Sequence, residues 1–322
     1  MLTPDSVIDY LVNRGILPHG GTATARPLLG GVSNEVLAVS GDGIDVVVKQ
    51  ALSQLRVEQE WLADPTRVLV EADALRIAGR YVPEAVPAVV DADPQQLTLT
   101  VARAPRHWAD WKTQLMQGTA EPAVARLLGS TLACWHSATA ARDDLPERFG
   151  TSHFEQLRIG PYYQAAAARH PDLAVTVNEF ADALLADRSC LVHGDFSPKN
   201  ILTDGHSAWV IDWEVAHYGS PVFDLAFLHT HLLLKAVHQP EHAAAYEQCA
   251  QAFGTSYAQT TRLPPIQPAQ LAGQVGCLLL ARADGKSPAE YLDPRGRQRT
   301  RALARAALTQ SADLNDLWKT LT

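Results

Sequence analysis

Residues 191 to 212, LVHGDFSPKNILTDGHSAWVID, constrain this chain more than any other segment. Asp195 and Asn200 stand five residues apart, and Asp212 follows the apolar run WVI. Asp195, Asn200 and Asp212 thus bring two carboxylates and one carboxamide into a short stretch of chain. Oxygen ligands of this kind suit hard divalent cations such as Mg²⁺ or Mn²⁺.

Strand and turn signals predict how these side chains are placed. The apolar runs 191–192, 201–202 and 209–211 predict strands, and Asp204-Gly205 is typical of a turn between the last two. Asp212 then emerges at the end of a strand. This layout is typical of a phosphoryl-transfer site, where the protein mainly positions the reactants and neutralises charge.

Three blocks of sequence, in this order, carry a family resemblance: HGD at 193–195 followed by Asn200, IDWE at 211–214, and GSPVFDLA at 219–226. Together they resemble the superfamily of aminoglycoside phosphotransferases, choline kinases and methylthioribose kinases. The string FSPKNIL at 196–202 resembles actinobacterial members described only as phosphotransferases. The resemblance implies an α+β, two-lobed protein-kinase-like fold, with a small antiparallel N-terminal β lobe that has one main helix and a larger, mostly helical C-terminal lobe. It also implies an NTP-dependent kinase with an alcohol group as acceptor.

Residue roles follow from this resemblance. Asp195 matches the base that receives the proton of the acceptor hydroxyl, and Asn200 and Asp212 match the Mg²⁺ ligands. His193 resembles the family's structural histidine, which braces the catalytic loop. Asp224 is expected to open a helix and to tie its carboxylate to the backbone of that loop.

Two residues near these blocks leave alternatives open. Lys199 lies in Ser-Pro-Lys, where many relatives have a different tripeptide, so it either stabilises charge in the transition state or faces solvent. Glu214, two residues after Asp212, either braces a second metal ion or forms hydrogen bonds with its own loop.

A glycine-containing turn in the N-terminal part is expected to approach the nucleotide phosphates. The paired glycines allow backbone N–H groups to come close to a phosphate, although a plain hairpin turn is the alternative. The residues expected to contribute are Gly30, Gly31, Ser33 and Asn34.

Lys49 ends the β-branched run Val46–Val48, which predicts a buried strand. A lysine in this place resembles the strand lysine that binds nucleotide phosphates in kinases. The alternative is a strand-end lysine whose amine reaches solvent.

Such a lysine needs a carboxylate to hold it, normally from the next helix. The residues after Arg67 have an apolar stripe at helical spacing, which directs Glu71 inward. Glu71 is preferred because a glutamate four residues before Leu75 resembles the helix-borne glutamate of the family. The competing carboxylates are Glu58, Glu60 and Asp73.

The boundary between the two lobes is predicted near residues 101–105. The β-rich run 97–101 ends there, and a helical pattern begins with Trp108. We therefore expect a nucleotide-binding lobe at 1–104 and a catalytic and acceptor-binding lobe at 105–322. Val101 and Arg103 lie at the expected hinge, where backbone groups hold the base, so ATP and GTP are both open as co-substrates.

The acceptor site is the least defined part of the sequence. Candidates are Arg158, Tyr162, Arg282 and Lys286. A single Arg282 stands where methylthioribose kinases use a pair, so a hydroxylated antibiotic or related natural product ranks first. A sugar or amino alcohol of the methylthioribose, homoserine or choline kind ranks second. A catalytically silent nucleotide-binding module is the alternative from a different class.

Composition excludes several other classes. The formal net charge of −8 disfavours nucleic acid as a partner. Four scattered cysteines without a CxxC pair disfavour a zinc site or a disulfide framework. The chain has no signal-peptide pattern and no apolar run of membrane-spanning length, so we expect a cytoplasmic protein without membrane contact and leave its oligomeric state open.

Overall fold

The computed structural model describes residues 1–28, 34–54, 63–310 and 312–322. They form two compact units. Unit 1 comprises Met1–His107 and Asp212–Val215, and unit 2 comprises Trp108–Ile211 and Ala216–Thr322. The assignment of nucleotide binding to 1–104 and of catalysis to 105–322 concerns function and stays a prediction.

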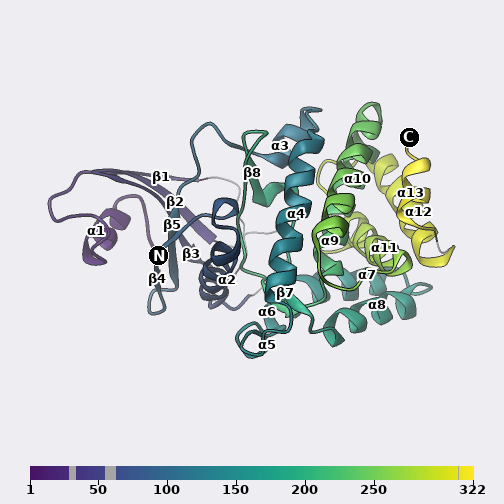
Figure 1. Cartoon of the computed structure of the whole chain (residues 1–322), viewed down its shortest axis with the longest axis horizontal. Coiled ribbons are helices and arrows are strands. Elements are labelled where there is room, and N and C mark those ends of the chain that lie inside the picture. Colours follow the sequence, from purple (N-terminus) through teal and green to yellow (C-terminus); the bar gives the residue numbers. More distant parts are fainter. Residues whose placement is uncertain (29–33, 55–62, 311) are drawn as a thin grey trace. The chain divides into compact units, whose positions relative to one another are not determined.

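Unit 1 is built on a five-stranded antiparallel sheet with the strand order β1-β2-β3-β5-β4 (Figure 1). Its strands are β1 (Thr24–Pro27), β2 (Asn34–Gly41), β3 (Ile44–Ala51), β4 (Val89–Asp93) and β5 (Thr98–Ala102). The tight turn between β2 and β3 places Gly43 at a φ of 83°, a conformation that glycine adopts without strain. Alternate residues of β3, Val46 and Val48, enter the core, as the β-branched run predicts.

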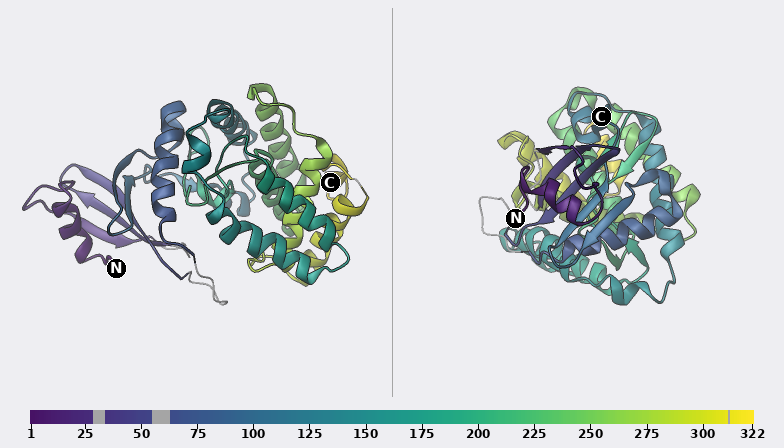
Figure 2. Two further views of the ribbon diagram at one scale, coloured as in Figure 1. Left: turned by 90° about the horizontal axis from the view of Figure 1, so that it is seen from below. Right: turned by 90° about the vertical axis from the view of Figure 1, so that its left-hand side faces the viewer.

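Two main helices accompany this sheet. Helix α1 (Ser6–Asn13) packs Val7 and Leu11 into a core that includes Leu37 of β2. Helix α2 (Arg67–Tyr81) contacts β3, β4 and β5, and Figure 2 shows it beside the sheet from two further sides. A short 3-10 turn, η1 (Pro83–Ala85), follows α2. The apolar stripe of α2 is buried, and this orients the face that carries Glu71.

Unit 2 contains two small antiparallel sheets. One has the order β6-β8-β9 and the other pairs β7 with β10. Their strands are β6 (Ala109–Asp110), β7 (Cys190–Val192), β8 (Ile201–Thr203), β9 (Ala208–Val210) and β10 (His217–Gly219). The predicted strands 191–192 and 201–202 therefore belong to different sheets.

The rest of unit 2 is helical. Helix α4 packs on α10, α9 packs on α10 and α11, and α11 packs on α12 (Figure 1). The helical segments are α3 (Trp111–Met116), α4 (Pro122–Thr139), α5 (Leu145–Arg148), α6 (Ser152–Phe154), the π-helix η2 (Glu155–Gln164), α7 (Ala165–Arg169), α8 (Ala174–Ala186), η3 (Pro198–Asn200), α9 (Val222–His238), η4 (Pro240–His242), α10 (Ala243–Thr260), α11 (Pro268–Asp284), α12 (Pro294–Thr309) and α13 (Leu314–Lys319). Helix α9 is buried on almost every side, so it forms the centre of this unit.

One expected helix starts later than predicted. The pattern after Trp108 predicts a helix from that residue, but α3 begins at Trp111. The Asp110 side chain accepts a hydrogen bond from the Thr113 N–H at 2.8 Å and so caps the helix there. The expected α+β class, with an antiparallel sheet followed by a helix-rich part, is confirmed.

In the residues that the structure describes, no helix is both long enough and apolar enough to cross a membrane.

Candidate active site

Lys49 of β3 lies at the centre of a buried charge cluster in unit 1. Its Nζ is 2.6 Å from Glu71 Oε1 and 3.1 Å from Asp212 Oδ1, and only 8% of the residue is exposed. Glu71 is therefore the carboxylate that pairs with Lys49. Asp73, a competing candidate, lies on the exposed side of α2, and Glu58 and Glu60 lie outside the described residues.

Burial alone would lower the pKa of Lys49, but the carboxylates of Glu71 and Asp212 outweigh it and raise that pKa. Lys49 is therefore a permanent cation. Asp212 adopts a φ of 69°, in the left-handed region that non-glycine residues rarely occupy. Backbone strain of this kind is common at functional sites, where the surrounding structure holds it.

Glu214 is held by two other residues of unit 1. Its Oε2 accepts hydrogen bonds from Asn34 Nδ2 at 2.9 Å and from Arg67 Nε at 3.1 Å. Arg67 is fully buried and also donates to the carbonyl of Leu52 at 2.8 Å. Of the two alternatives for Glu214, these contacts favour a structural role in fixing the segment that carries Asp212.

Arg67 has no part in the sequence prediction. A signal was present, because a basic residue in the first turn of a helix opposes the helix dipole and so requires a specific partner. For Arg67, the first residue of α2, that partner is Glu214.

The other nucleotide candidates lie apart from Lys49 or outside the described residues. Gly30, Gly31 and Ser33 belong to the latter group. Val101 pairs with Val47 within the sheet. Arg103 Nη1 contacts Asp45 Oδ1 at 3.2 Å, and the pKa of that carboxyl lies below its usual value because hydrogen bonds from Ser40 and Arg103 outweigh its burial. A role of either hinge residue beside the base stays a prediction.

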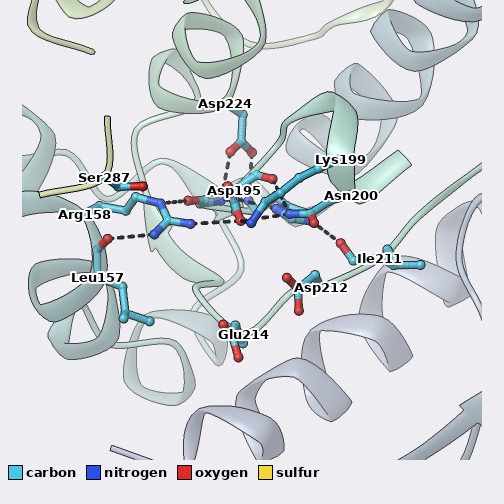
Figure 3. A network of polar contacts seen from close by, with 12 residues as sticks. Leu157, Arg158, Asp195, Lys199, Asn200, Ile211, Asp212, Glu214, Asp224 and Ser287 are labelled. Atoms are coloured by element: carbon cyan, nitrogen blue, oxygen red, sulfur yellow. Dashed lines mark hydrogen bonds and ion pairs between the residues drawn. The ribbon is translucent and has the colours of Figure 1, made fainter. Parts of the chain in front are cut away.

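Asp195 lies in unit 2, in the loop between β7 and η3, and is 4% exposed. Its Oδ2 lies 2.8 Å from Asn200 Nδ2, 3.1 Å from Arg158 Nη2 and 3.1 Å from Lys199 Nζ (Figure 3). Asn200 Nδ2 donates a further hydrogen bond to the Asp195 carbonyl at 3.0 Å. The two cations compensate the charge of the buried carboxylate, and the carboxamide fixes its rotamer.

Asp224, in the first turn of α9, holds the backbone of this loop. Its two carboxylate oxygens accept hydrogen bonds from the N–H groups of His193 at 2.8 Å and Gly194 at 2.9 Å, and Figure 3 shows both oxygens directed at the loop. His136 Nε2 lies 3.2 Å away. Burial alone would raise the pKa of Asp224, but the hydrogen bond and charge of His136 and the contacts with His193 lower it. His136 is another residue that sequence reasoning missed.

His193 is fixed in one neutral tautomer. Its Nδ1 accepts a hydrogen bond from the Asp195 N–H at 3.0 Å, and its Nε2 donates to the Ile211 carbonyl at 3.1 Å. With one nitrogen accepting and the other donating, both ring nitrogens are engaged in hydrogen bonds to the backbone. The geometry suits a brace for the loop.

Asn200 in unit 2 and Asp212 in unit 1 each have oxygen donors of the kind that a hard divalent cation prefers. Because both N–H bonds of the Asn200 carboxamide are directed at Asp195, its Oδ1 faces the opposite way. The cluster around Lys49 and Arg67 contains three carboxyl groups, one more than its cations. Burial raises the pKa of one of them, Glu71, to about 7, although Lys49 acts in the opposite direction. In the described ranges no three His, Cys, Asp or Glu residues are grouped to hold a metal ion. Mg²⁺ commonly binds one or two carboxylates and takes its other ligands from phosphate and water.

Three of the four acceptor candidates come together in unit 2. The Arg158 guanidinium lies 5.5 Å from the centre of the Tyr162 ring. Burial alone would raise the pKa of Tyr162, but the charges of Arg282 and Arg158 lower it. Lys286 is exposed, and its backbone N–H donates to the Pro161 carbonyl at 3.3 Å. Acceptor binding by these residues stays a prediction.

The profile of the phosphotransferase enzyme family (APH) matches residues 24–265. The chain belongs to this family. A methylthioribose kinase of Geobacillus sp. (strain WCH70) is 24% identical over 301 residues, which cover 83% of this chain and 75% of that kinase. The phosphotransferase is accordingly a kinase that transfers phosphate to an alcohol acceptor, and its family implies ATP as co-substrate.

Solved structures show that this phosphotransferase has the expected kinase-like fold. An amicoumacin kinase in complex with AMP-PNP, Ca²⁺ and its antibiotic has a TM-score of 0.61 at 15% identity, with 98% of this chain and 97% of that chain covered. A macrolide 2'-phosphotransferase from Brachybacterium faecium has a TM-score of 0.53 at 21% identity, with 95% and 98% covered. At these identities the likeness concerns the fold.

Proposed function

We propose that the chain is a small-molecule O-phosphotransferase that moves the γ-phosphate of ATP or GTP to a hydroxyl of its acceptor. The observation that carries the proposal is the buried Asp195, whose carboxylate and backbone carbonyl each accept a hydrogen bond from Asn200 Nδ2 within one loop. A carboxylate fixed in this way can receive a proton without rearrangement.

The proposed reaction is a single displacement. The acceptor oxygen forms a bond to the γ-phosphorus, the bond from that phosphorus to the β,γ-bridging oxygen breaks, and the hydroxyl proton moves to Asp195. Lys49, held by Glu71, binds phosphate oxygens of the nucleotide. Asn200 and Asp212 would hold Mg²⁺ or Mn²⁺, which neutralises phosphate charge when bound.

Two acceptor classes follow from different observations. A hydroxylated antibiotic or related natural product agrees with the amicoumacin and macrolide kinases among the similar folds. A sugar or amino alcohol agrees with the methylthioribose kinases among the relatives and with an aminopropanol kinase of similar fold. We place the antibiotic class first and the metabolite class second.

The test is label transfer from γ-labelled ATP or GTP, with Mg²⁺, to a panel of hydroxylated antibiotics, sugars and amino alcohols. We expect label on the hydroxyl of at least one acceptor, and loss of transfer with Asp195→Asn. Tight nucleotide binding without transfer to any acceptor would instead identify a catalytically silent module.

A further inference from the structure

Lys235, in the last turn of α9, is completely buried. Its Nζ donates one long hydrogen bond, 3.4 Å, to the His231 carbonyl one turn earlier. In the part of the chain that the structure describes, no carboxylate oxygen lies within 4.0 Å of this nitrogen. A buried ammonium without a carboxylate partner costs several kcal/mol, so natural proteins rarely retain one.

The groups around Lys235 increase this cost. Burial, together with the cations Lys112 and Arg282, lowers the pKa of Lys235 to about 7, although Glu290 and Asp110 act in the opposite direction. Glu290 is already engaged, because Lys112 Nζ lies 2.6 Å from its Oε1. The surroundings therefore leave a positive charge uncompensated.

Arg282 on α11 also lacks a carboxylate partner among the described residues. It is 9% exposed and contacts Ser287 through Nη1, at 2.8 Å from the hydroxyl oxygen. Its Nε is buried and has no hydrogen-bond partner within the described residues. The hydroxyl of Tyr291, whose ring centre lies 5.9 Å from Lys235 Nζ, is also buried and unpartnered there.

These groups adjoin Asp195 through a chain of contacts inside unit 2. The Arg158 guanidinium, which contacts Asp195, lies 5.5 Å from the ring centre of Phe227 on α9. The Phe227 ring lies 5.1 Å from the ring of His231, one turn before Lys235. Burial lowers the pKa of His231, and the positive charges of Lys235, Arg282, Lys199 and Lys112 lower it further.

An excess of buried cations and unpartnered donors next to a base that receives a hydroxyl proton fits a negatively charged substrate. Polycationic acceptors and quaternary ammonium compounds would be repelled. Building on the proposed function, we infer that Lys235 and Arg282 bind an anionic group of the acceptor, so that the substrates are hydroxyl compounds that carry a carboxylate or a phosphate.

The test compares the full-length protein with Lys235→Met, which keeps the length and apolar stem of the side chain. Titration calorimetry at pH 7 with saturating Mg²⁺ and AMP-PNP would use gluconate, a hexose phosphate, sorbitol and an aminoglycoside as probes. Gluconate and sorbitol share a six-carbon polyol chain and differ at the terminal carboxylate. Lys319→Met is the matched control, because it removes a lysine whose side chain is 72% exposed.

We expect at least one anionic probe to bind wild type, and its Kd to rise at least about 10-fold in Lys235→Met, since a desolvated charge contact is worth well over one decade in affinity. Preference for gluconate or for the hexose phosphate would identify the anionic group. Binding of sorbitol or the aminoglycoside in preference to both anions would overturn the inference, and so would the absence of anion binding.

A second readout needs no acceptor. Lys235→Met should raise Tm by about 2 °C or more, because it removes an uncompensated buried charge. An unchanged or lower Tm would mean that Lys235 serves the fold and would contradict the inference. Failure of the proposed function can be told apart from failure of this inference. The former would appear as absent Mg-nucleotide binding or absent phosphoryl transfer. The Tm comparison, and a repeat of the anion titration without nucleotide, would still report on Lys235.

Discussion

The two clusters of buried charge in this phosphotransferase have opposite balances. In unit 1, Lys49 and Arg67 contact the three carboxyl groups of Glu71, Asp212 and Glu214, so carboxyl groups outnumber cations. In unit 2, the cations Lys235, Lys112 and Arg282 outnumber Glu290 and Asp110, the carboxylates that influence Lys235. Among the described residues neither Lys235 nor Arg282 has an ion-pair partner.

The difference separates two uses of a buried charge. Where opposite charges are already in contact, the protein is organised before the ligand arrives, and removal of one partner leaves the other exposed to a low dielectric. Where the partner is missing, the unpaired charge lowers the stability of the protein. Such a charge is kept when it binds a ligand that supplies the opposite charge. The charge cluster in unit 1 thus favours the binding of a cation, and the cluster in unit 2 favours the binding of an anion.

The largest expected effect comes from metal removal, which tests whether the carboxylate-rich cluster in unit 1 serves a metal ion. Chelation with excess EDTA should abolish phosphoryl transfer, and Mg²⁺ or Mn²⁺ should restore it, because Asn and Asp oxygens prefer hard ions. Zn²⁺ should not restore it. Label-transfer assays with each added metal measure this, and full activity in EDTA would show that the carboxylate excess has another purpose.

The next effect concerns Lys49 and Glu71. Because Glu71 is proposed to act by orienting Lys49, Lys49→Ala and Glu71→Ala should each reduce kcat/KM by roughly 10-fold to 10³-fold. The double variant should be little worse than Lys49→Ala alone.

Steady-state kinetics of both single variants and the double variant measure this coupling. Asp73→Ala is the matched control, since that carboxylate lies on the same helix with 46% of its side chain exposed. Additive losses would mean that the two residues act independently.

The smallest effect concerns the pH dependence of stability at Lys235. The lysine pKa is about 7 in the folded protein and 10.5 in the unfolded chain, so between these values the unfolded state binds more protons. Stability from this group therefore rises with pH across that window. The Tm advantage of Lys235→Met over wild type should be largest near pH 7 and shrink toward pH 10.

Thermal unfolding of both proteins from pH 7 to pH 10 measures this difference. The groups that face Lys235 are Lys112, His231, Arg282, Glu290, Asp110 and Tyr291, and both proteins share them. A Tm difference that is constant over this range would show that Lys235 is not buried as a titrating amine.

Local patterns predicted much of the fold. The β-branched run before Lys49 predicted β3, and the apolar stripe around Glu71 predicted the inward face of α2. Asp204-Gly205 predicted the turn between β8 and β9. Each of these signals lies within a few residues of the element that it specifies.

Contacts between distant segments could not be predicted in the same way. Arg67 reaches Glu214 across 147 residues, and His136 reaches Asp224 across 88 residues. Lys235 reads as an ordinary polar residue at one end of an apolar helix, because its burial depends on α11 and on the residues near Tyr291. These partners follow from tertiary packing, which periodicity does not encode.

The most direct test of the proposed function compares Asp195→Asn with Asp212→Asn by two readouts, Mg-AMP-PNP affinity from calorimetry and phosphoryl transfer under saturating nucleotide. Asp195→Asn should keep nucleotide affinity close to that of wild type and lose turnover by about 10² to 10⁴, the usual contribution of a positioned general base. Asp212→Asn should instead weaken Mg-nucleotide binding. Equal loss of nucleotide affinity in both variants, or an Asp195→Asn enzyme with normal turnover, would contradict the assignment of the base and the metal ligand.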